Sequence, residues 1–418
     1  MSGPASPDDR ASTTLHVRPF RPGQVAPPPG PAPDLTGGAA PSLWLGAEPV
    51  GGLTLPAAMP TASQLYAPRG VWLDDERLIA ADTGNHRLLI WSGPIDRQPW
   101  HGPADVVLGQ PDFRSEGAQA GGRGPERGLR LPTGVLVVDG RLVVADAWNH
   151  RILVWDEVPT RSDVAPDVVL GQADPVEVEE NRGGRCGPLT FYWPFGIAMV
   201  GDTFYVADTG NRRVLAWSGG VPEPDREPDV VLGQPGPDVR EENRGRLGPD
   251  SFRWPHDIAG STGTPGPDRA GSRSADGFVL VADAGNHRLL GWTPPPTADG
   301  PAGQVLGQPD FVTGSEFPYA PQTATGLRFP YAVDIDGELM AVADTANNRI
   351  LLWDGLPGES GAPATRVLGQ PTFAANGENR WDTVAADSLC WPYGLRLHGR
   401  RLAIADSGNN RIVVWDVS

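Results

Sequence analysis

The 418-residue sequence predicts an all-β protein, a six-bladed β-propeller with four antiparallel strands in each blade. Three observations lead to this fold class. One motif recurs six times at a nearly fixed period, a second motif follows in the same register, and one copy of the second motif is displaced to the N-terminal side. A fixed period indicates a repeat architecture, in which each unit buries its apolar face against its neighbours.

The first motif joins a short polar turn to an apolar run. Its copies read ADTGNHRLLIW (81–91), ADAWNHRILVW (145–155), ADTGNRRVLAW (207–217), ADAGNHRLLGW (282–292), ADTANNRILLW (343–353) and ADSGNNRIVVW (405–415). The steps between successive aspartates are 64, 62, 75, 61 and 62 residues. The longest step contains a polar insertion, residues 261–277, between two strand patterns.

Two further motifs complete the unit. The second reads VVLGQPDF (106–113), VVLGQADP (168–175), VVLGQPGP (230–237), QVLGQPDF (304–311) and RVLGQPTF (366–373). The third precedes each turn: APRGVWL (67–73), LPTGVLV (131–137), WPFGIAM (193–199), WPHDIAG (254–260), FPYAVDI (329–335) and WPYGLRL (391–397). Each unit therefore contains four β-like runs, which in the third unit are residues 196–200, 203–208, 213–217 and 229–233.

The sixth unit ends at Ser418, before a copy of the second motif can follow, and LWLGAEPV (43–50) supplies that copy at the other end of the chain. An N-terminal strand that completes the last blade would close a ring through backbone hydrogen bonds, which a linear solenoid does not need. We therefore expect the propeller to span residues 42–418. Residues 1–41, rich in Pro, Gly and Ala, are predicted to form a disordered tail.

Composition limits the function. The formal net charge is −17, which disfavours nucleic acid and anionic membranes as partners. All 34 basic residues are Arg, so a Walker-type phosphate loop and a Schiff-base lysine are excluded. No signal peptide and no apolar run of about 18 residues are apparent. We expect a soluble cytoplasmic protein, and the Arg- and Ala-rich coding without Lys suggests a bacterial source.

The repeated A-D-x-x-N-x-R followed by an apolar run resembles the NHL-repeat family, whose domains are six-bladed propellers. The resemblance covers about residues 42–418, and the VLGQP extension is similar to bacterial NHL proteins, most of which have no assigned activity. Among relatives that are enzymes, the peptide-amidating lyase holds a metal in its channel with several histidines, and six-bladed lactonases use channel Glu, Asn and Asp ligands. This sequence lacks both sets, so neither activity carries over.

Residue types present in all six units are expected to be structural. The aspartate should accept backbone N–H groups at the turn, and the arginine five residues later should pair with it or with a neighbouring blade. The asparagine of the turn, such as Asn85, suits a position of positive φ. The tryptophan that ends each motif, such as Trp91, should pack between blades. Cys186 and Cys390 fall in connectors three blades apart, so no disulfide is expected.

A functional site should break the symmetry of the ring. In the strand that lines the channel, one register is aliphatic throughout, and the next holds Trp72, Leu136, Ala198, Ala259, Asp334 and Arg396. We expect this second register to face the channel, with Asp334 and Arg396 as an ion pair. The position after each proline varies most and should surround one channel mouth: Arg69, Thr133, Phe195, His256, Tyr331 and Tyr393.

His256 and Asp257 are the sharpest deviation, because WPHD replaces the usual W-P-x-G. As a functional pair they would be a general base and its orienting carboxylate; otherwise they are a loop histidine beside a turn aspartate. His256, Asp257 and Asp334 are the catalytic candidates. They are too few for a convincing metal site, so no metal or other cofactor is expected, with one divalent ion in the channel as the alternative.

The long connectors from VLGQ to the proline motif share the face of the channel mouth. Three of them carry Glu-Asn-Arg, at 180–182, 242–244 and 378–380, which either braces the loop or belongs to a docking surface. We expect a non-enzymatic scaffold or accessory protein that binds a protein or peptide partner through this face. The alternative is a hydrolase or lyase with its site in the channel mouth around the variable residues and Arg396.

Overall fold

The computed structural model describes residues 34–56, 58–262, 277–316 and 321–418. The tail prediction for residues 1–33 and most of the polar insertion after residue 261 lie outside the described residues. The first strand, β1 (Ala40–Gly46), begins slightly before the expected start of the propeller. Residues 34–39 are described as well, and the carbonyl of Leu35 accepts the N–H of Val367 at 3.0 Å.

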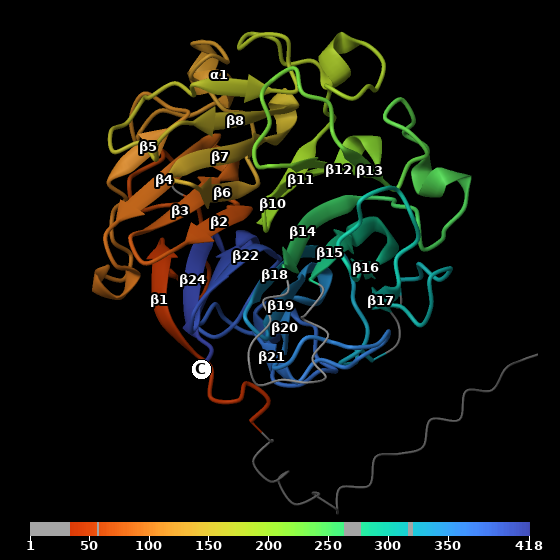
Figure 1. Cartoon of the computed structure of the whole chain (residues 1–418). Helices are drawn as coiled ribbons and strands as arrows, with labels where there is room; N and C mark the ends of the chain where they lie inside the picture. The colour runs from red at the N-terminus through yellow and green to blue at the C-terminus, as the bar shows by residue number, and fades with distance from the viewer. Residues whose placement is uncertain (1–33, 57, 263–276, 317–320) are drawn as a thin grey trace, which may run out of the picture. The chain divides into compact units, whose positions relative to one another are not determined.

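The predicted six-bladed β-propeller is confirmed. Six antiparallel sheets of four strands surround a central channel, and the innermost strand of each sheet lies beside the innermost strands of its neighbours (Figure 1). Among the described residues, helical structure is limited to short turns, and no helix is both long and apolar enough to cross a membrane. The proline motif thus leads into the inner strand of each blade, and the VLGQ motif contains its outermost strand.

Within each blade, the strands follow one another from the channel outward. The first three blades consist of β2 (Gly70–Leu73), β3 (Arg77–Asp82), β4 (Arg87–Ser92), β5 (Val106–Leu108); β6 (Val135–Val138), β7 (Arg141–Asp146), β8 (Arg151–Trp155), β9 (Val168–Leu170); and β10 (Pro194–Val200), β11 (Thr203–Asp208), β12 (Arg213–Ser218), β13 (Val230–Leu232). The last three consist of β14 (Pro255–Ser261), β15 (Phe278–Asp283), β16 (Arg288–Trp292), β17 (Gln304–Leu306); β18 (Pro330–Asp336), β19 (Leu339–Asp344), β20 (Arg349–Trp353), β21 (Arg366–Leu368); and β22 (Pro392–His398), β23 (Arg401–Asp406), β24 (Arg411–Asp416), β1.

Short helical segments connect these strands. A single turn follows the second strand of each blade: η1 (Thr83–Asn85), η3 (Ala147–Asn149), η5 (Thr209–Asn211), η8 (Ala284–Asn286), η9 (Thr345–Asn347) and η11 (Ser407–Asn409). The other described segments are η2 (Ile95–Arg97), α1 (Ala118–Gly122), η4 (Glu180–Gly183), η6 (Glu242–Gly245) and η10 (Glu378–Trp381). Three of them, η4, η6 and η10, are the Glu-Asn-Arg sites of the connectors.

The ring closes as the displaced LWLG copy predicts. Strand β1 pairs antiparallel with β24, with Trp44 opposite Val413 and Leu45 opposite Ile412. The two ends of the propeller therefore share one sheet, which removes the exposed edges that an open array would leave. The closing blade differs in one detail: the Arg411 guanidinium lies 4.1 Å from the Trp44 ring, and its Nη1 has no hydrogen-bond partner among the described residues.

The core lies between blades. Each of the five buried apolar clusters joins residues of neighbouring blades, and the tryptophans that end the turn motif belong to them. Trp91, for example, is fully buried and packs in one cluster with Leu45 of β1 and Val414 of β24. The expected role of these tryptophans in packing between blades is therefore confirmed, and it leaves the channel lining free to vary.

Candidate functional site

The Asp–Asn–Arg turns form a buried frame on the face where the channel opens. In the second blade, one oxygen of Asp146 accepts the N–H of Arg130 at 2.7 Å. The other oxygen accepts from Asn149 and from Nε of Arg151, both at 2.8 Å. Arg151 then donates to three backbone carbonyls of the connectors on either side. All six Asp–Arg pairs are fully buried, which confirms their structural role.

The residue after the turn asparagine fastens one blade to the next. Nδ1 of His150 accepts the N–H of Trp193 at 3.1 Å, and Oδ1 of Asn348 accepts the N–H of Trp391 at 2.9 Å. This residue, not the asparagine, has positive φ, so the expected backbone conformation of the asparagine was wrong by one position. The six residues are His86, His150, Arg212, His287, Asn348 and Asn410.

The blade junction between β12 and β14 lacks this contact. Arg212 stands where the other blades have His or Asn, and the N–H of Trp254 lies 3.3 Å from Oδ1 of Asp283 instead. Trp254 is also absent from the positive-φ residues, unlike Trp193 and Trp391 at the same place in their blades. The blade that carries His256 and Asp257 is therefore joined to its predecessor differently from the rest.

The connectors are fastened to the frame as well. Asn181 and Asn211 exchange amide hydrogen bonds of 3.1 and 2.9 Å, and Asn379 and Asn409 do the same at 2.9 and 2.8 Å. Each of the five buried glutamines of the VLGQ motif donates to a carbonyl of the turn in its own blade and to a carbonyl of the connector that follows it. The asparagine of Glu-Asn-Arg thus braces its loop, which leaves the outer side chains of the connectors as the surface that contacts solvent.

A cavity of about 320 Å³ lies in the channel, lined by the six inner strands. All of the residues that follow the prolines line it: Arg69, Thr133, Phe195, His256, Tyr331 and Tyr393. They stand at the beginning of the inner strands, so they form the rim at one end. Asp257 comes one position further along its strand, and Asp334 and Arg396 come three positions beyond Tyr331 and Tyr393, so these charged residues lie deeper.

The rim residues form a nearly continuous belt of planar groups. Centroids of His256 and Tyr331 are 4.2 Å apart and stacked, those of Tyr331 and Tyr393 are 4.5 Å apart, and those of His256 and Phe195 are 4.3 Å apart. The guanidinium of Arg69 continues the series, 4.6 Å from the Tyr393 ring. One stacked pair and two tilted pairs at this spacing hold each ring through its neighbours, so the belt is preorganised.

Trp148 closes the belt, although the sequence motifs did not single it out. Thr133 is the small member of the rim set, and its hydroxyl donates to the carbonyl of Phe195 at 2.9 Å. The indole of Trp148 spans this gap, with centroids 5.5 Å from the Phe195 ring and 5.7 Å from the Arg69 guanidinium. The available signal was the turn sequence ADAWN, in which Trp stands where the other five copies have Gly or Ala.

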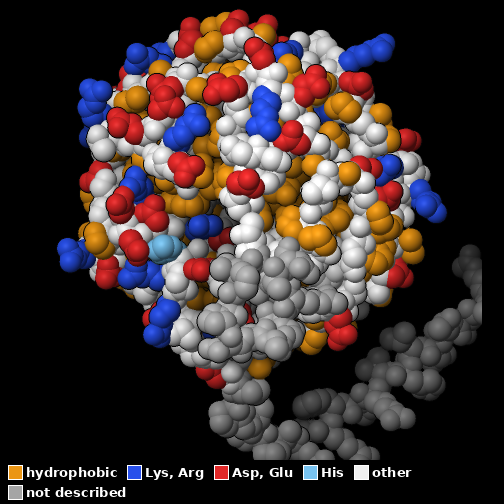
Figure 2. Space-filling model, in the orientation of Figure 1, with side chains coloured by type: hydrophobic (Ala, Val, Ile, Leu, Met, Phe, Trp, Pro, Cys, Tyr) orange, Lys and Arg blue, Asp and Glu red, His pale blue; other side chains and the backbone are white. Residues whose placement is uncertain are grey.

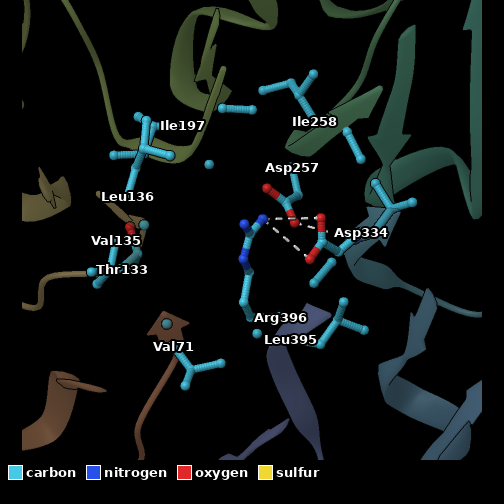
Figure 3. A pocket seen from close by; sticks show the side chains of 18 of the residues that line it. Val71, Thr133, Val135, Leu136, Ile197, Asp257, Ile258, Asp334, Leu395 and Arg396 are labelled. Carbon is cyan, nitrogen blue, oxygen red and sulfur yellow. Dashed lines mark hydrogen bonds and ion pairs between the residues drawn. The ribbon is translucent and has the colours of Figure 1, made fainter. Parts of the chain in front are cut away.

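Below the rim, charged groups converge in the cavity (Figure 3). Nη1 of Arg396 lies 3.4 Å from both oxygens of Asp334, so the expected ion pair is present. Asp334 also accepts the N–H of Leu397 at 2.7 Å, and the Arg396 guanidinium lies 4.0 Å over the Trp72 ring. Burial raises the pKa of Asp334, while the Arg396 charge opposes that rise.

His256 and Asp257 are not joined as a catalytic dyad. The imidazole stacks in the belt, whereas Oδ2 of Asp257 accepts the N–H of Val333 at 3.1 Å from the next blade. No hydrogen bond links the two side chains, both of which the structure describes. Burial, reinforced by the Arg69 charge, lowers the pKa of His256 to about 3. Burial also raises the pKa of Asp257 to about 8, so the histidine is neutral and the carboxyl is largely protonated at neutral pH.

Candidate metal ligands are sparse in the described part of the chain. No group of three or more His, Cys, Asp or Glu side chains is close enough to hold an ion there. Asp257 and Asp334 are the acids that the cavity offers, and each already accepts a backbone N–H. The two cysteines are buried and free. Burial raises their thiol pKa values, to about 11 for Cys186 and about 12 for Cys390.

Comparison with known proteins adds family information. The NHL repeat family model matches residues 129–155, which is the second blade from its connector to Trp155. No sequence among the curated proteins matches this chain.

Several solved structures are similar over most of the chain. The WD40 β-propeller domain of Doa1 has a TM-score of 0.44 and 9% identity, covering 90% of this chain and 97% of that one. A protein of unknown function from Bacteroides thetaiotaomicron has a TM-score of 0.47 and 11% identity, covering 90% of this chain and 75% of that one. Virginiamycin B lyase from Staphylococcus aureus has a TM-score of 0.40 and 10% identity, covering 86% of this chain and 97% of that one.

Similarities of this size say nothing about the activity of this chain. Residues 129–155 match the NHL repeat model, and the other five blades carry the same Asp–Asn–Arg turn, with its Asp and Arg buried in every blade. The NHL repeat at residues 129–155 and the six four-stranded blades together support an NHL-repeat β-propeller.

Proposed function

We propose that the protein is a non-enzymatic cytoplasmic scaffold or accessory factor that binds a protein or peptide partner on the face formed by its connectors. The observation that carries this proposal is the belt of aromatic rings and Arg69 around the channel mouth. Aromatic residues and Arg are enriched where protein interfaces derive most of their binding energy. A preorganised belt also loses little conformational entropy when a partner binds.

Exposed aromatic side chains extend this surface beyond the rim. Tyr66, Trp254, Trp381 and Trp391 are 45%, 38%, 80% and 40% exposed. Each lies in a connector or directly before the proline of an inner strand, and therefore on the face of the channel mouth. Large aromatic groups left in water on one face of a rigid frame support a binding role for that face.

The distribution of charge favours a protein over a nucleic acid. The chain carries a net charge of −17, and on the face shown in Figure 2 the basic and acidic side chains are interspersed. Binding to a phosphate backbone draws most of its affinity from clustered cations. A peptide partner needs no such cluster, because aromatic contacts and a few directed hydrogen bonds suffice.

A hydrolase or lyase in the channel mouth, with or without a divalent ion, is the second candidate. Asp257 supports it, because a carboxyl whose pKa is raised to about 8 inside a cavity is a typical feature of catalytic sites. Turnover of an ester, lactone or peptide substrate that Asp257→Asn abolishes would replace the binding proposal with this one, and stoichiometric metal in the purified protein would identify the metal-assisted form.

Site-specific photo-crosslinking in extracts of the source organism tests the binding proposal. A photoreactive amino acid replaces Trp381, on the connector face, and in a matched protein it replaces Glu223, an exposed residue in the loop between β12 and β13 on the opposite face. We expect one discrete adduct from position 381 and none from position 223. Equal labelling from both faces, or no adduct from position 381, would contradict the proposal.

A further inference from the structure

Arg69 is a cation at the channel mouth whose side chain has no polar partner in the described part of the chain. Its guanidinium is half-buried and makes no hydrogen bond or ion pair with any described residue, and its Nε is shielded from water. Two aromatic rings hold it, those of Tyr393 and Trp148. A guanidinium carries five N–H donors and a permanent charge. Donors shielded from water without acceptors cost free energy unless a ligand supplies the acceptors.

Several other cations on the same face have acidic partners. Arg253 lies 3.3 Å from Glu242, and Arg380 lies 2.8 Å from Asp387. Arg328 is in direct contact with Glu316. The connectors thus provide carboxylates for these guanidinium groups within the chain. The absence of such a group within reach of Arg69, among the residues described, points to an acceptor that comes from outside.

The belt favours an anion next to this guanidinium. Successive rings from Phe195 to Tyr393 lie 4.2–4.5 Å apart at interplanar angles of 27–34°, so each ring covers part of its neighbour's face. The edge of an aromatic ring carries partial positive charge and its face partial negative charge. A carboxylate in the opening would therefore meet the guanidinium beside rings whose negative faces are partly covered, and the adjoining apolar atoms of the partner would contact the rings.

The acids below the rim do not compete for Arg69. Asp334 is engaged by the N–H of Leu397 and by Arg396. Asp257 accepts the N–H of Val333 and stays largely protonated at neutral pH, because burial raises its pKa to about 8. The floor of the cavity therefore repels an incoming anion less than two free carboxylates would.

We propose that the channel mouth binds a carboxylate group of the partner chain through the guanidinium of Arg69. Arg and carboxylate form two parallel charge-assisted hydrogen bonds, which the planar fork of a half-buried, stacked Arg is well placed to make. This inference rests on the proposed peptide-binding function and gives the partner its chemistry. The carboxylate comes from an Asp or Glu side chain or from a C-terminus, and the experiment separates the two.

Three matched pentapeptides, each acetylated, test the inference by calorimetry or ligand-observed NMR at low salt. The first has a central Glu and an amidated C-terminus, the second has Gln with the amide, and the third has Gln with a free C-terminal carboxylate. We expect the first or the third to bind about tenfold or more tightly than the second, as a hydrogen-bonded charge pair implies. Which of the two binds identifies the source of the carboxylate.

Two variants separate Arg69 from general electrostatics. Arg69→Gln should bind all three peptides equally weakly. Arg226→Gln, which removes an exposed cation from the opposite face, should retain the selectivity. Acetate, but not chloride at the same ionic strength, should displace the carboxylate peptide from the unaltered protein, so the test does not depend on the folding of a variant. Equal binding of all three peptides, no binding of any, or unchanged selectivity in Arg69→Gln would overturn the inference.

The two proposals fail separately. A discrete adduct from position 381 combined with peptide binding that ignores the carboxylate would leave the binding function standing and remove the role of Arg69. Carboxylate-selective binding without such an adduct would leave the role of Arg69 standing and remove the proposed binding of a partner at position 381.

Discussion

The repeated turns and the channel mouth are built from the same six blades, yet they treat their charged groups in opposite ways. In each turn an Asp and an Arg are fully buried, and the carboxylate accepts from the Arg, from an Asn and from a backbone N–H. At the mouth, equivalent positions hold six residues of different chemistry, and Arg69 has no polar partner among the described residues. Satisfied, symmetric groups stabilise the fold, whereas the unsatisfied, asymmetric ones are available to a ligand.

The largest expected effect comes from breaking a turn. Asp208→Ala leaves Arg213 buried without its carboxylate, together with the amide of Asn211 and the N–H of Tyr192. Removing one partner of a buried pair costs about 3–5 kcal/mol. We expect a clear drop in the denaturation midpoint measured by circular dichroism, with poor expression as the extreme case.

The exposed pair of Arg226 and Asp229 provides the control for that experiment. Arg226→Ala should change the stability by about 1 kcal/mol or less, since exposed ion pairs contribute little. If Asp208→Ala were no more destabilising than Arg226→Ala, the turns would not be the stabilising frame that we describe.

An intermediate effect is expected from the histidines that join blades. His86, His150 and His287 each accept a backbone N–H through Nδ1, which only an unprotonated nitrogen can do. Burial lowers the pKa of all three, to about 4 for His150. As the pH falls, the histidines of the unfolded chain bind protons before those of the folded chain do. The contribution of the three histidines to the free energy of unfolding should therefore be present above pH 6.5 and be lost as the pH falls from 6.5 toward 4.

Substituting all three histidines by Asn sharpens this point. Asn348 and Asn410 already make the same contact in the last two blades, so the fold accepts Asn at this position. The melting temperature of the triple variant should fall less between pH 7 and pH 4 than that of the unaltered protein. Parallel pH profiles for the two proteins would mean that the junctions do not sense protonation.

An effect of the opposite sign, a gain in stability, is expected at the mouth from Asp257→Asn. A protonated carboxyl and an amide have nearly the same shape, and both keep an oxygen for the N–H of Val333. The pKa of Asp257 is raised to about 8 in the folded protein, so folding holds a proton that the unfolded chain releases above its ordinary pKa of 3.8. Unaltered protein should therefore lose stability relative to the variant as the pH rises from about 4 through 8.

Melting temperatures of Asp257→Asn and the unaltered protein, compared across this range, check the prediction. The two should coincide in acid and separate by a few degrees at neutral pH. A variant less stable than the unaltered protein at pH 7 would show that Asp257 is ionised and needed as a carboxylate, which would favour a catalytic role for the mouth.

The sequence by itself determined the architecture. Six copies of A-D-x-x-N-x-R specify a buried polar turn that any blade can form locally, since the Asp, Asn and Arg lie within six residues of one another. The displaced LWLG run specified ring closure, because a strand missing at one end and present at the other pairs in only one way. The varied residues after the prolines could also be assigned to the rim from the sequence. Their place at the start of each inner strand follows from the local motif and from the alternation of side chains along a strand.

Only the tertiary structure decided which side chains complete the rim and what each of them contacts. Trp148 belongs to a turn, and its contact with Arg69 and Phe195 depends on how three blades meet. His256 and Asp257 both line the cavity, but a register shift between Pro255 and Asp257 interrupts the strand alternation. The imidazole stacks in the belt, and the carboxyl accepts the N–H of Val333 from the next blade. That none of the described acids pairs with Arg69 is likewise set by distances across the ring, which no local pattern of residues encodes.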